Sequence, residues 1–401
     1  MRKIQTAMIL CATCFSAGFL FAQAEATPPA APDASVLNET QWEQLDQAVD
    51  RGLTWLATKQ RADGSFDSID LGQPGVTSFC VMAFLAQGES PIDGKYQQQL
   101  SKAIDFIANQ QKPNGLIAFS APSEVPIERA IVRHTETPKG AIGRTVVYNH
   151  AISALTICEA YGQCSPEQSK KLAPVIKRAI AATLEMQAWG PKSEKDVGGW
   201  RYLYRHGADK NSLKSDSDLS VSGWQLMFLR SARNAGFDVP KESIDNAVKY
   251  IENCYLAAEN RKVHGYLTNN STACTRAMAG AGILAMAHAG KHDSEAAIGS
   301  GEWILKHDFK DYNNADPVYQ DRVSDRYHYG AVVCSQAMFQ LGGKFWKQFF
   351  PPLVDTLLAN QKADGSWPRD RSDRRYGNCY STSLSILSLT VPNQMLPIFQ
   401  R

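Results

Sequence analysis

Apolar residues recur at helical spacing in six separate segments of the chain. In the first segment, Leu45, Val49, Leu53 and Leu56 occupy positions i, i+4, i+8 and i+11, which puts all four on one face of a helix. The pattern returns in shorter or less regular form at residues 100–107, 176–184, 248–251, 303–305 and 353–357. Each segment therefore predicts an amphipathic helix with one buried side and one solvent-facing side.

A second kind of segment follows each amphipathic one. These segments are apolar on almost every side, rich in small residues, and mostly end in glycine, which is typical of a helix C-terminus. They comprise residues 77–88, 148–162, 218–236, 275–290, 327–343 and 380–392. A helix that is apolar all round is buried all round. The chain is thus expected to alternate outer and inner helices, and no strand pattern of comparable length is present.

A short turn motif joins the two helices of a pair. The clearest copies run from Gln60 to Phe66, as QRADGSF, and from Gln361 to Trp367, as QKADGSW. A weaker copy lies at residues 109–119, and degenerate copies lie at residues 187–202, 264–267 and 306–309. Asp-Gly favours a tight turn in which glycine takes a positive φ. We interpret the motif as a staple of each helical hairpin rather than as an active-site loop. The glutamine is expected to bridge backbone groups, and Phe66 or Trp367 is expected to fold back on the outer helix.

This motif resembles the QW repeat of the terpenoid cyclase and protein prenyltransferase superfamily, of the squalene cyclase type, over residues 41–392. The resemblance implies a helical toroid, a fold that hosts several chemistries. An open solenoid of repeats needs polar caps at its ends. The last inner segment is instead apolar and only a few residues follow it, which favours a closed ring. The prediction is therefore an all-α protein, an (α/α)6 toroid whose parallel inner helices surround a central cavity.

The N-terminal region predicts export. Residues 1–24 combine a basic start, an apolar stretch and a small-x-small site at Ala22-Gln23-Ala24, which is typical of a secretory signal peptide. Residues 25–39 form a Pro/Ala-rich linker, and residues 40–401 form the single toroid domain. No other run approaches the ~18 apolar residues of a membrane helix, so no transmembrane span is expected after cleavage. We expect a periplasmic or secreted protein.

Composition limits the classes of partner that we expect. The 401 residues are 44% hydrophobic and 20% charged with a net charge of +2, so there is no basic stripe and nucleic acid is not an expected partner. Seven cysteines remain after cleavage and none forms a C-x-x-C pair, which favours buried small hydrophobes. Cys158 and Cys164 are the one pair close enough in sequence to suggest a local disulfide bridge.

Chemistry is expected where the inner helices begin. In a ring of parallel helices all six N-termini open at one mouth, which their dipoles and free N–H groups make locally positive. The residues expected there are Cys80, Asn149, His150, Asp216, Asp218, Cys274, Arg276, Tyr327, His328, Cys379 and Tyr380.

The first candidate site is Asp216-Ser-Asp218-Leu219. It resembles the D-x-D-D motif of squalene-hopene-type cyclases, in which the middle Asp protonates an alkene; Asp218 matches that acid and Asp216 the first position, while Leu219 departs from the pattern. Such an acid needs surroundings that keep it neutral. The alternative is that both carboxylates cap the helix.

The second candidate is a zinc site of the prenyltransferase kind. The resemblance matches Cys274 and His328 to two ligands, but Thr272 stands where the family has Asp, so the third ligand is missing and zinc needs at least three. Cys379 or His150 could substitute. The alternative is a buried cysteine and a histidine at the rim.

The third candidate is glycan chemistry in the long loops at residues 119–147, 189–215 and 308–326. Their basic and aromatic residues suit an anionic sugar, and the alternative is a solvated loop surface. They are Arg133, His134, Arg144, Trp200, Arg201, Tyr202, Tyr204, Arg205 and His206.

Together these observations favour an exported toroid that binds or cyclises an isoprenoid-like apolar ligand in its central cavity, as a terpenoid cyclase-like isomerase or a prenyltransferase-like transferase. Export argues against prenyl transfer to proteins, since prenyl diphosphates and their protein acceptors are cytosolic. The alternatives are a polysaccharide lyase or hydrolase and a non-catalytic protein-interaction toroid.

Overall fold

The computed structural model describes residues 34–127, 132–133, 138–189, 192–205, 216–258, 261–268, 273–314 and 325–400. They belong to one compact unit that spans Ala31–Arg401. The expected signal peptide and most of the expected linker lie outside the described residues.

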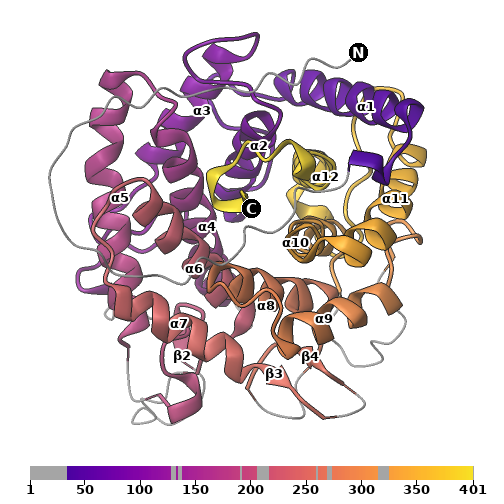
Figure 1. The fold of residues 1–401 in the computed structure, drawn as a ribbon. Coiled ribbons are helices and arrows are strands. Elements are labelled where there is room, and N and C mark those ends of the chain that lie inside the picture. The colour runs from indigo at the N-terminus through magenta and orange to yellow at the C-terminus, as the bar shows by residue number, and fades with distance from the viewer. Residues whose placement is uncertain are drawn as a thin grey trace, which may run out of the picture. The chain divides into compact units, whose positions relative to one another are not determined.

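Twelve α-helices alternate between an outer and an inner layer of the described chain. The outer helices are α1 (Glu39–Ala57), α3 (Gln97–Asn109), α5 (Pro166–Gln187), α7 (Lys241–Asn253), α9 (Glu295–Lys306) and α11 (Gly343–Ala359). The inner helices are α2 (Gly75–Ala86), α4 (Pro138–Tyr161), α6 (Leu219–Asn234), α8 (Arg276–His288), α10 (Tyr327–Leu341) and α12 (Asn378–Leu389). Figure 1 shows the outer helices surrounding the inner ones. The six predicted hairpins are confirmed.

Short elements connect these helices. The 3-10 helices are η1 (Ala34–Val36), η2 (Asp70–Gly72), η4 (Glu194–Asp196), η5 (Arg374–Tyr376), η6 (Val391–Asn393) and η7 (Pro397–Phe399). Strand β1 (Val132–Arg133) pairs in parallel with β2 (Tyr204–Arg205), and β3 (Tyr255–Leu256) pairs antiparallel with β4 (Val263–His264).

The inner helices form a closed ring. Each inner helix packs against the next one in the chain, and the last, α12, packs against the first, α2. The outer helices α1 and α11 also meet at this seam. The all-α toroid expected from the sequence is therefore the fold of this unit.

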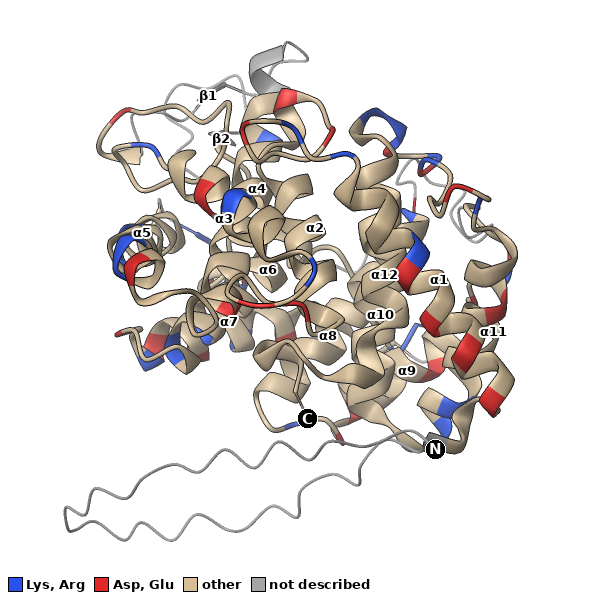
Figure 2. Cartoon of the chain, turned by 90° about the horizontal axis from the view of Figure 1, so that it is seen from above, with Lys and Arg blue, Asp and Glu red and all other residues tan. Residues whose placement is uncertain are grey.

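Charged residues lie mainly on the outer helices, as the hydrophobic pattern predicts. Every residue of α2 is buried, and neither α2, α10 nor α12 contains a Lys, Arg, Asp or Glu. In α1 the buried residues repeat at helical spacing along one face, whereas the other face carries charges. Figure 2 shows charged residues on α1, α5, α7 and α11 and almost none on the inner helices that it labels.

The glutamine of the turn motif joins neighbouring repeats, whereas the sequence predicted a staple within one hairpin. The Gln361 side-chain amide donates to the Gly365 carbonyl at 2.9 Å and to the Ala48 carbonyl of α1 at 2.8 Å. Gln60, Gln111 and Gln187 make the same pair of bonds, each to its own turn and to the next outer helix. Because Gln361 reaches α1, its two hydrogen bonds also close the ring.

The glycine of the motif lets the turn approach the next helix. Gly365 has a φ of +92°, and a Cβ placed on it would lie 2.5 Å from the Arg51 carbonyl oxygen. Trp367 folds back onto its outer helix as expected, since its indole Nε1 donates to the Leu357 carbonyl at 2.8 Å. Its backbone N–H donates to Thr382 Oγ1 on the inner helix at 3.0 Å, so one turn connects three helices.

The cysteines of the described chain are free. Cys158 and Cys164 are both buried and no disulfide joins them, so the suggested local bridge is not present. Among the described residues, no helix is both long and apolar enough to cross a membrane.

Candidate functional site

Two adjoining cavities lie at the N-terminal ends of the inner helices. The larger has a volume of about 300 Å³ and the smaller about 120 Å³. The larger is lined by Tyr148, Tyr202, Ser220, Tyr266, Thr275, Ala277, Met278, Asp325, Arg326 and Tyr329. The smaller is lined mainly by apolar and aromatic side chains, among them Leu71, Val76, Phe79, Ile152, Trp224, Tyr376 and Tyr380. Tyr148, Arg326 and Tyr329 belong to both walls, so the cavities meet at these three residues.

Of the eleven residues expected at the mouth, Asn149 and Tyr380 line the smaller cavity and the other nine line neither one. His150, Arg276, Tyr327 and Cys379 are among these nine and are buried, which corrects their predicted placement. The reason is helical rotation: each residue turns the side chain by about 100°, so Asn149, Ala277 and Arg326 face the cavities, whereas His150, Arg276 and Tyr327 next to them do not.

His150 has a structural role. Helix α4 begins at Pro138, so His150 lies about three turns inside the helix rather than at its start. Its Nδ1 accepts a hydrogen bond from the Ile117 backbone N–H at 3.1 Å, and its Nε2 lies 3.0 Å from Thr183 Oγ1. Burial lowers the pKa of His150 to about 3, so the imidazole is neutral.

Arg276 and Tyr327 anchor the loop that follows α9. Arg276 Nε lies 2.5 Å from Asp325 Oδ2, and its guanidinium stacks 3.9 Å from the ring centre of Phe309. The Tyr327 hydroxyl donates to the Phe309 carbonyl at 2.8 Å. Both side chains are thus held by contacts within the protein.

Asp218 caps α6, as the alternative interpretation of the acidic motif expected. Its Oδ1 accepts from the Val221 N–H at 2.8 Å and from Ser220 Oγ at 2.7 Å. Burial raises the pKa of Asp218, although Arg201, 3.4 Å away, opposes this. Asp216 is partly exposed and lies 3.4 Å from the same guanidinium.

Asp218 does not itself line either cavity, but it is connected to both. Ser220 Oγ, which donates to Asp218, also lies 2.5 Å from the Tyr148 hydroxyl, and Tyr148 faces both cavities. The chain Asp218–Ser220–Tyr148 therefore connects the buried Asp218 carboxyl to the cavity through hydrogen bonds.

The segment before α6 supplies aromatic wall to the larger cavity. Arg201 lies 4.8 Å above the ring of Tyr202 and 5.3 Å from that of Tyr266, and the two tyrosine hydroxyls are hydrogen-bonded to each other. Trp200, one of the residues considered for glycan binding, is buried, and its indole donates to the Thr183 carbonyl. His134 and His206 lie outside the described residues.

The described residues do not form the zinc site that the resemblance suggested. His328 Nδ1 lies 2.8 Å from Asp370 Oδ2 and its Nε2 lies 3.0 Å from the Tyr312 hydroxyl, so both ring nitrogens are engaged. Cys274 is partly buried, which raises the pKa of its thiol. Thr272 lies outside the described residues, and within them no three His, Cys, Asp or Glu side chains gather around a common point.

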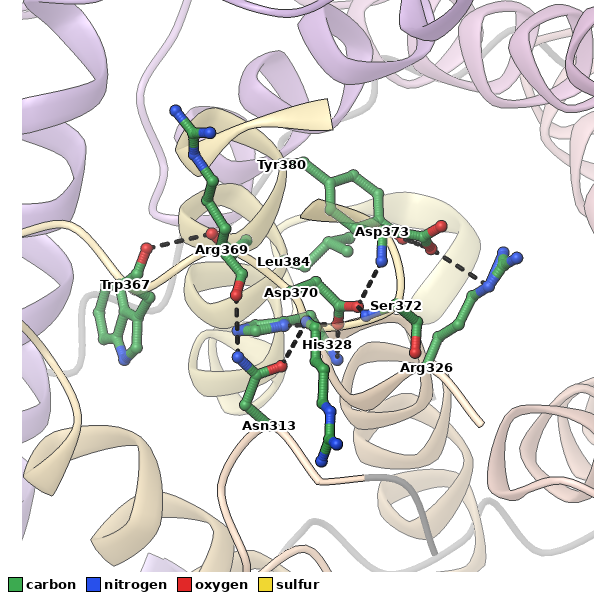
Figure 3. A network of polar contacts seen from close by, with 12 residues as sticks. Asn313, Arg326, His328, Trp367, Arg369, Asp370, Ser372, Asp373, Tyr380 and Leu384 are labelled. Atoms are coloured by element: carbon green, nitrogen blue, oxygen red, sulfur yellow. Dashed lines mark hydrogen bonds and ion pairs between the residues drawn. The ribbon is translucent and has the colours of Figure 1, made fainter. Parts of the chain in front are cut away.

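The turn at residues 370–373, before α12, is part of the site that sequence reasoning missed. Asp370 Oδ1 accepts from the Ser372 and Asp373 N–H groups at 2.8 and 2.9 Å, and Oδ2 holds His328 (Figure 3). Burial opposes ionisation of Asp370, but these hydrogen bonds and His328 prevail and lower its pKa. The sequence DRSD, directly after the best copy of the turn motif, was the available signal.

This turn places Asp373 in the wall of the smaller cavity. Asp373 Oδ2 lies 3.2 Å from Arg326 Nε and accepts a 3.3 Å hydrogen bond from the Tyr380 hydroxyl (Figure 3). Burial raises the pKa of Asp373, and Arg326 opposes that shift. Its Oδ1 has no hydrogen-bond partner among the described residues.

No protein-family model and no curated protein matches this chain in sequence. Solved structures match in fold. The type II terpene cyclase MstE from Scytonema, in complex with geranylgeranyl dihydroxybenzoate, is 12% identical with a TM-score of 0.56, covering 90% of this chain and 100% of that one. Cellobiose 2-epimerase from Bacillus thermoamylovorans is 12% identical with a TM-score of 0.58, covering 88% and 99%. The GH76 α-mannanase from Bacteroides thetaiotaomicron is 12% identical with a TM-score of 0.53, covering 87% and 95%. These similarities establish the α/α toroid fold alone.

Proposed function

We propose that this chain is an exported toroid protein, periplasmic or secreted, that binds an isoprenoid-like apolar ligand in its central cavity. The observation that carries the proposal is the chemistry of the cavity wall. Aromatic rings from α2, α4, α6, α10 and α12 line the smaller cavity together with aliphatic side chains, and four tyrosines line the larger one. The larger volume, about 300 Å³, is at the lower end of the range of ~300–1,000 Å³ for small-molecule sites.

The aromatic wall is held in place by ring-to-ring contacts. Phe79 packs edge-on against Trp224 and Tyr380, with ring centres 5.7 and 6.1 Å apart, and the Trp224 indole donates to the Tyr329 hydroxyl at 3.0 Å. Such a wall gains free energy by removing an apolar chain from water. It would also attract a carbocation through ring faces. The fold similarity to a terpene cyclase in complex with geranylgeranyl dihydroxybenzoate supports the same ligand class.

Filling the smaller cavity should block the ligand. We expect Ile152→Trp to weaken binding of geranylgeraniol at least tenfold, because Ile152 lies in the cavity wall on α4 and a larger ring would occupy the space. The matched change Ile298→Trp, at an exposed position of α9, should leave binding unchanged. Native mass spectrometry or calorimetry of the purified protein measures both. Absence of isoprenoid binding to the unmodified protein would refute the proposal.

If the protein also cyclises its ligand, Asp218 is the proposed proton source. A proton passed through Ser220 and Tyr148 would add to the terminal alkene, a second double bond would close the ring, and loss of a proton back to this chain would yield an isomer of the substrate. Burial raises the pKa of Asp218, which is the direction that this chemistry requires.

Asp218→Asn tests this acid. Asparagine also caps helices well, so the variant should fold normally and still bind the ligand, while conversion to the cyclic isomer should fall by at least a hundredfold. Gas chromatography with mass spectrometry measures the conversion of bound ligand. Unchanged turnover in Asp218→Asn would exclude Asp218 as the acid.

A glycan ligand is the second candidate, because charged and phenolic groups converge in the same aromatic cavity. Arg326, Asp373 and several tyrosines could bind sugar hydroxyls, and the fold also occurs in a mannanase and a sugar epimerase. The binding assay above, repeated with cellobiose and manno-oligosaccharides, separates the two: binding of sugars without binding of geranylgeraniol would favour this candidate.

A further inference from the structure

The two cavities meet at a guanidinium group that is open to both. Arg326 directly precedes α10, belongs to both walls, and leaves 45% of its side-chain surface accessible. The other two arginines near the cavities are covered, with 13% of the Arg201 side chain and 3% of the Arg276 side chain accessible. Arg326 is therefore the arginine of this group that a molecule in the cavities can reach.

Arg326 also retains unused hydrogen-bond donors. Its Nε pairs with Asp373 Oδ2 at 3.2 Å (Figure 3), and no further polar contact of this guanidinium is found among the described residues. A guanidinium carries five N–H donors, and the two terminal nitrogens present a planar fork that matches a carboxylate. The fork is free to bind a ligand without breaking the ion pair.

The acidic groups in the walls neutralise Arg326 only partly. Asp325 forms an ion pair with Arg276, whose Nε lies 2.5 Å from Asp325 Oδ2. Asp373 offers Arg326 a single oxygen, which it shares with the Tyr380 hydroxyl, and burial raises the pKa of Asp373. The cavity junction thus keeps a cation with an incomplete counter-ion beside walls that are rich in aromatic side chains.

We propose that the ligand is an isoprenoid carboxylate whose head group binds the terminal nitrogens of Arg326 while its chain lies along the aromatic walls. This inference rests on the proposed function, because it assumes an apolar ligand in these cavities. A single carboxylate fits better than a diphosphate, since a diphosphate carries several charges and the cavity walls present one open cation among the described residues.

The test compares two probes with the same chain, geranylgeranoic acid and geranylgeraniol, by calorimetry at pH 7.5 below their micellar concentrations. The acid should bind at least tenfold more tightly than the alcohol. Arg326→Gln should abolish that preference and leave the affinity for the alcohol within about threefold. Arg233→Gln removes the same charge from an exposed arginine in the last turn of α6, outside both walls, and should preserve the preference.

Two more variants complete the test. Arg326→Lys keeps the charge but loses the planar fork, so the preference for the acid should fall without disappearing. Asp373→Asn removes the competing carboxylate and should strengthen binding of the acid. Equal binding of acid and alcohol to the unmodified protein, or a preference that survives Arg326→Gln, overturns the head-group assignment while the apolar cavity stands. If neither probe binds, the proposed function itself fails.

Discussion

Gly365→Ala should destabilise the protein by about 3 kcal/mol, because two penalties coincide at this position. The φ of +92° costs a residue with a Cβ about 1 kcal/mol or more. The added Cβ would also lie 2.5 Å from the Arg51 carbonyl oxygen of α1, and overpacking of this kind costs ~1–3 kcal/mol. Relief of the clash would pull Gln361 away from Ala48 and open the seam of the ring.

Gly236→Ala is the matched control for this prediction. Gly236 has a similar φ of +86°, but nothing lies within 4 Å of the Cβ that would be added. Its substitution should therefore cost only the conformational penalty of about 1 kcal/mol. Urea unfolding monitored by circular dichroism gives both free energies. Equal destabilisation by the two substitutions would contradict the view that the turn glycine is needed for close contact between repeats.

Acidification from pH 7 to pH 5 should remove about 4 kcal/mol of the free energy of unfolding, a large share of the ~5–15 kcal/mol typical of a native protein. Burial lowers the pKa values of His150, His264 and His288 to about 3. A group with a lowered folded-state pKa stabilises the fold above its unfolded pKa of 6.5 and loses that stabilisation as the pH falls. Each histidine then loses about 2 kcal/mol by pH 5, or about 6 kcal/mol together.

Glu159 reduces this acid-induced loss of stability but does not cancel it. Burial raises its pKa from 4.5 to about 7, so its stabilising contribution is complete below pH 4.5 and disappears as the pH rises through 7. As the pH falls from 7 to 5, Glu159 therefore adds about 2 kcal/mol to the free energy of unfolding. His288→Leu, which removes an imidazole whose Nε2 has no partner among the described residues, should roughly halve the net acid loss. His292→Leu serves as control, and identical pH profiles for the unmodified protein and His288→Leu would refute the argument.

The fold was predictable because its signals are local and repeated. Each outer helix shows its apolar face within a few turns, and each inner helix is apolar throughout, so the six hairpins follow from the sequence alone. The turn motif also predicted its own tight turn and folded-back aromatic residue. It did not show that Gln361 would bond to Ala48, because that partner lies 313 residues away in the chain.

The site was predicted less well, for two reasons. The beginning of an inner helix was inferred from its apolar pattern, but α4 extends to Pro138, so His150 lies within the helix and not at its start. The pattern also left the rotation of each helix undetermined, and so Arg276 and Tyr327 were chosen while Arg326, between two buried neighbours, was not.

The sequence by itself determined the repeat and the number of hairpins, because burial of apolar surface acts on every helix separately and leaves a periodic record in the chain. Only the tertiary structure decided which polar groups face the cavity. The pairs Arg326–Asp373 and His328–Asp370 join residues more than forty positions apart, and their geometry depends on how neighbouring helices rotate against one another. Polar contacts of this kind have no period, so they could be found only once the ring was assembled.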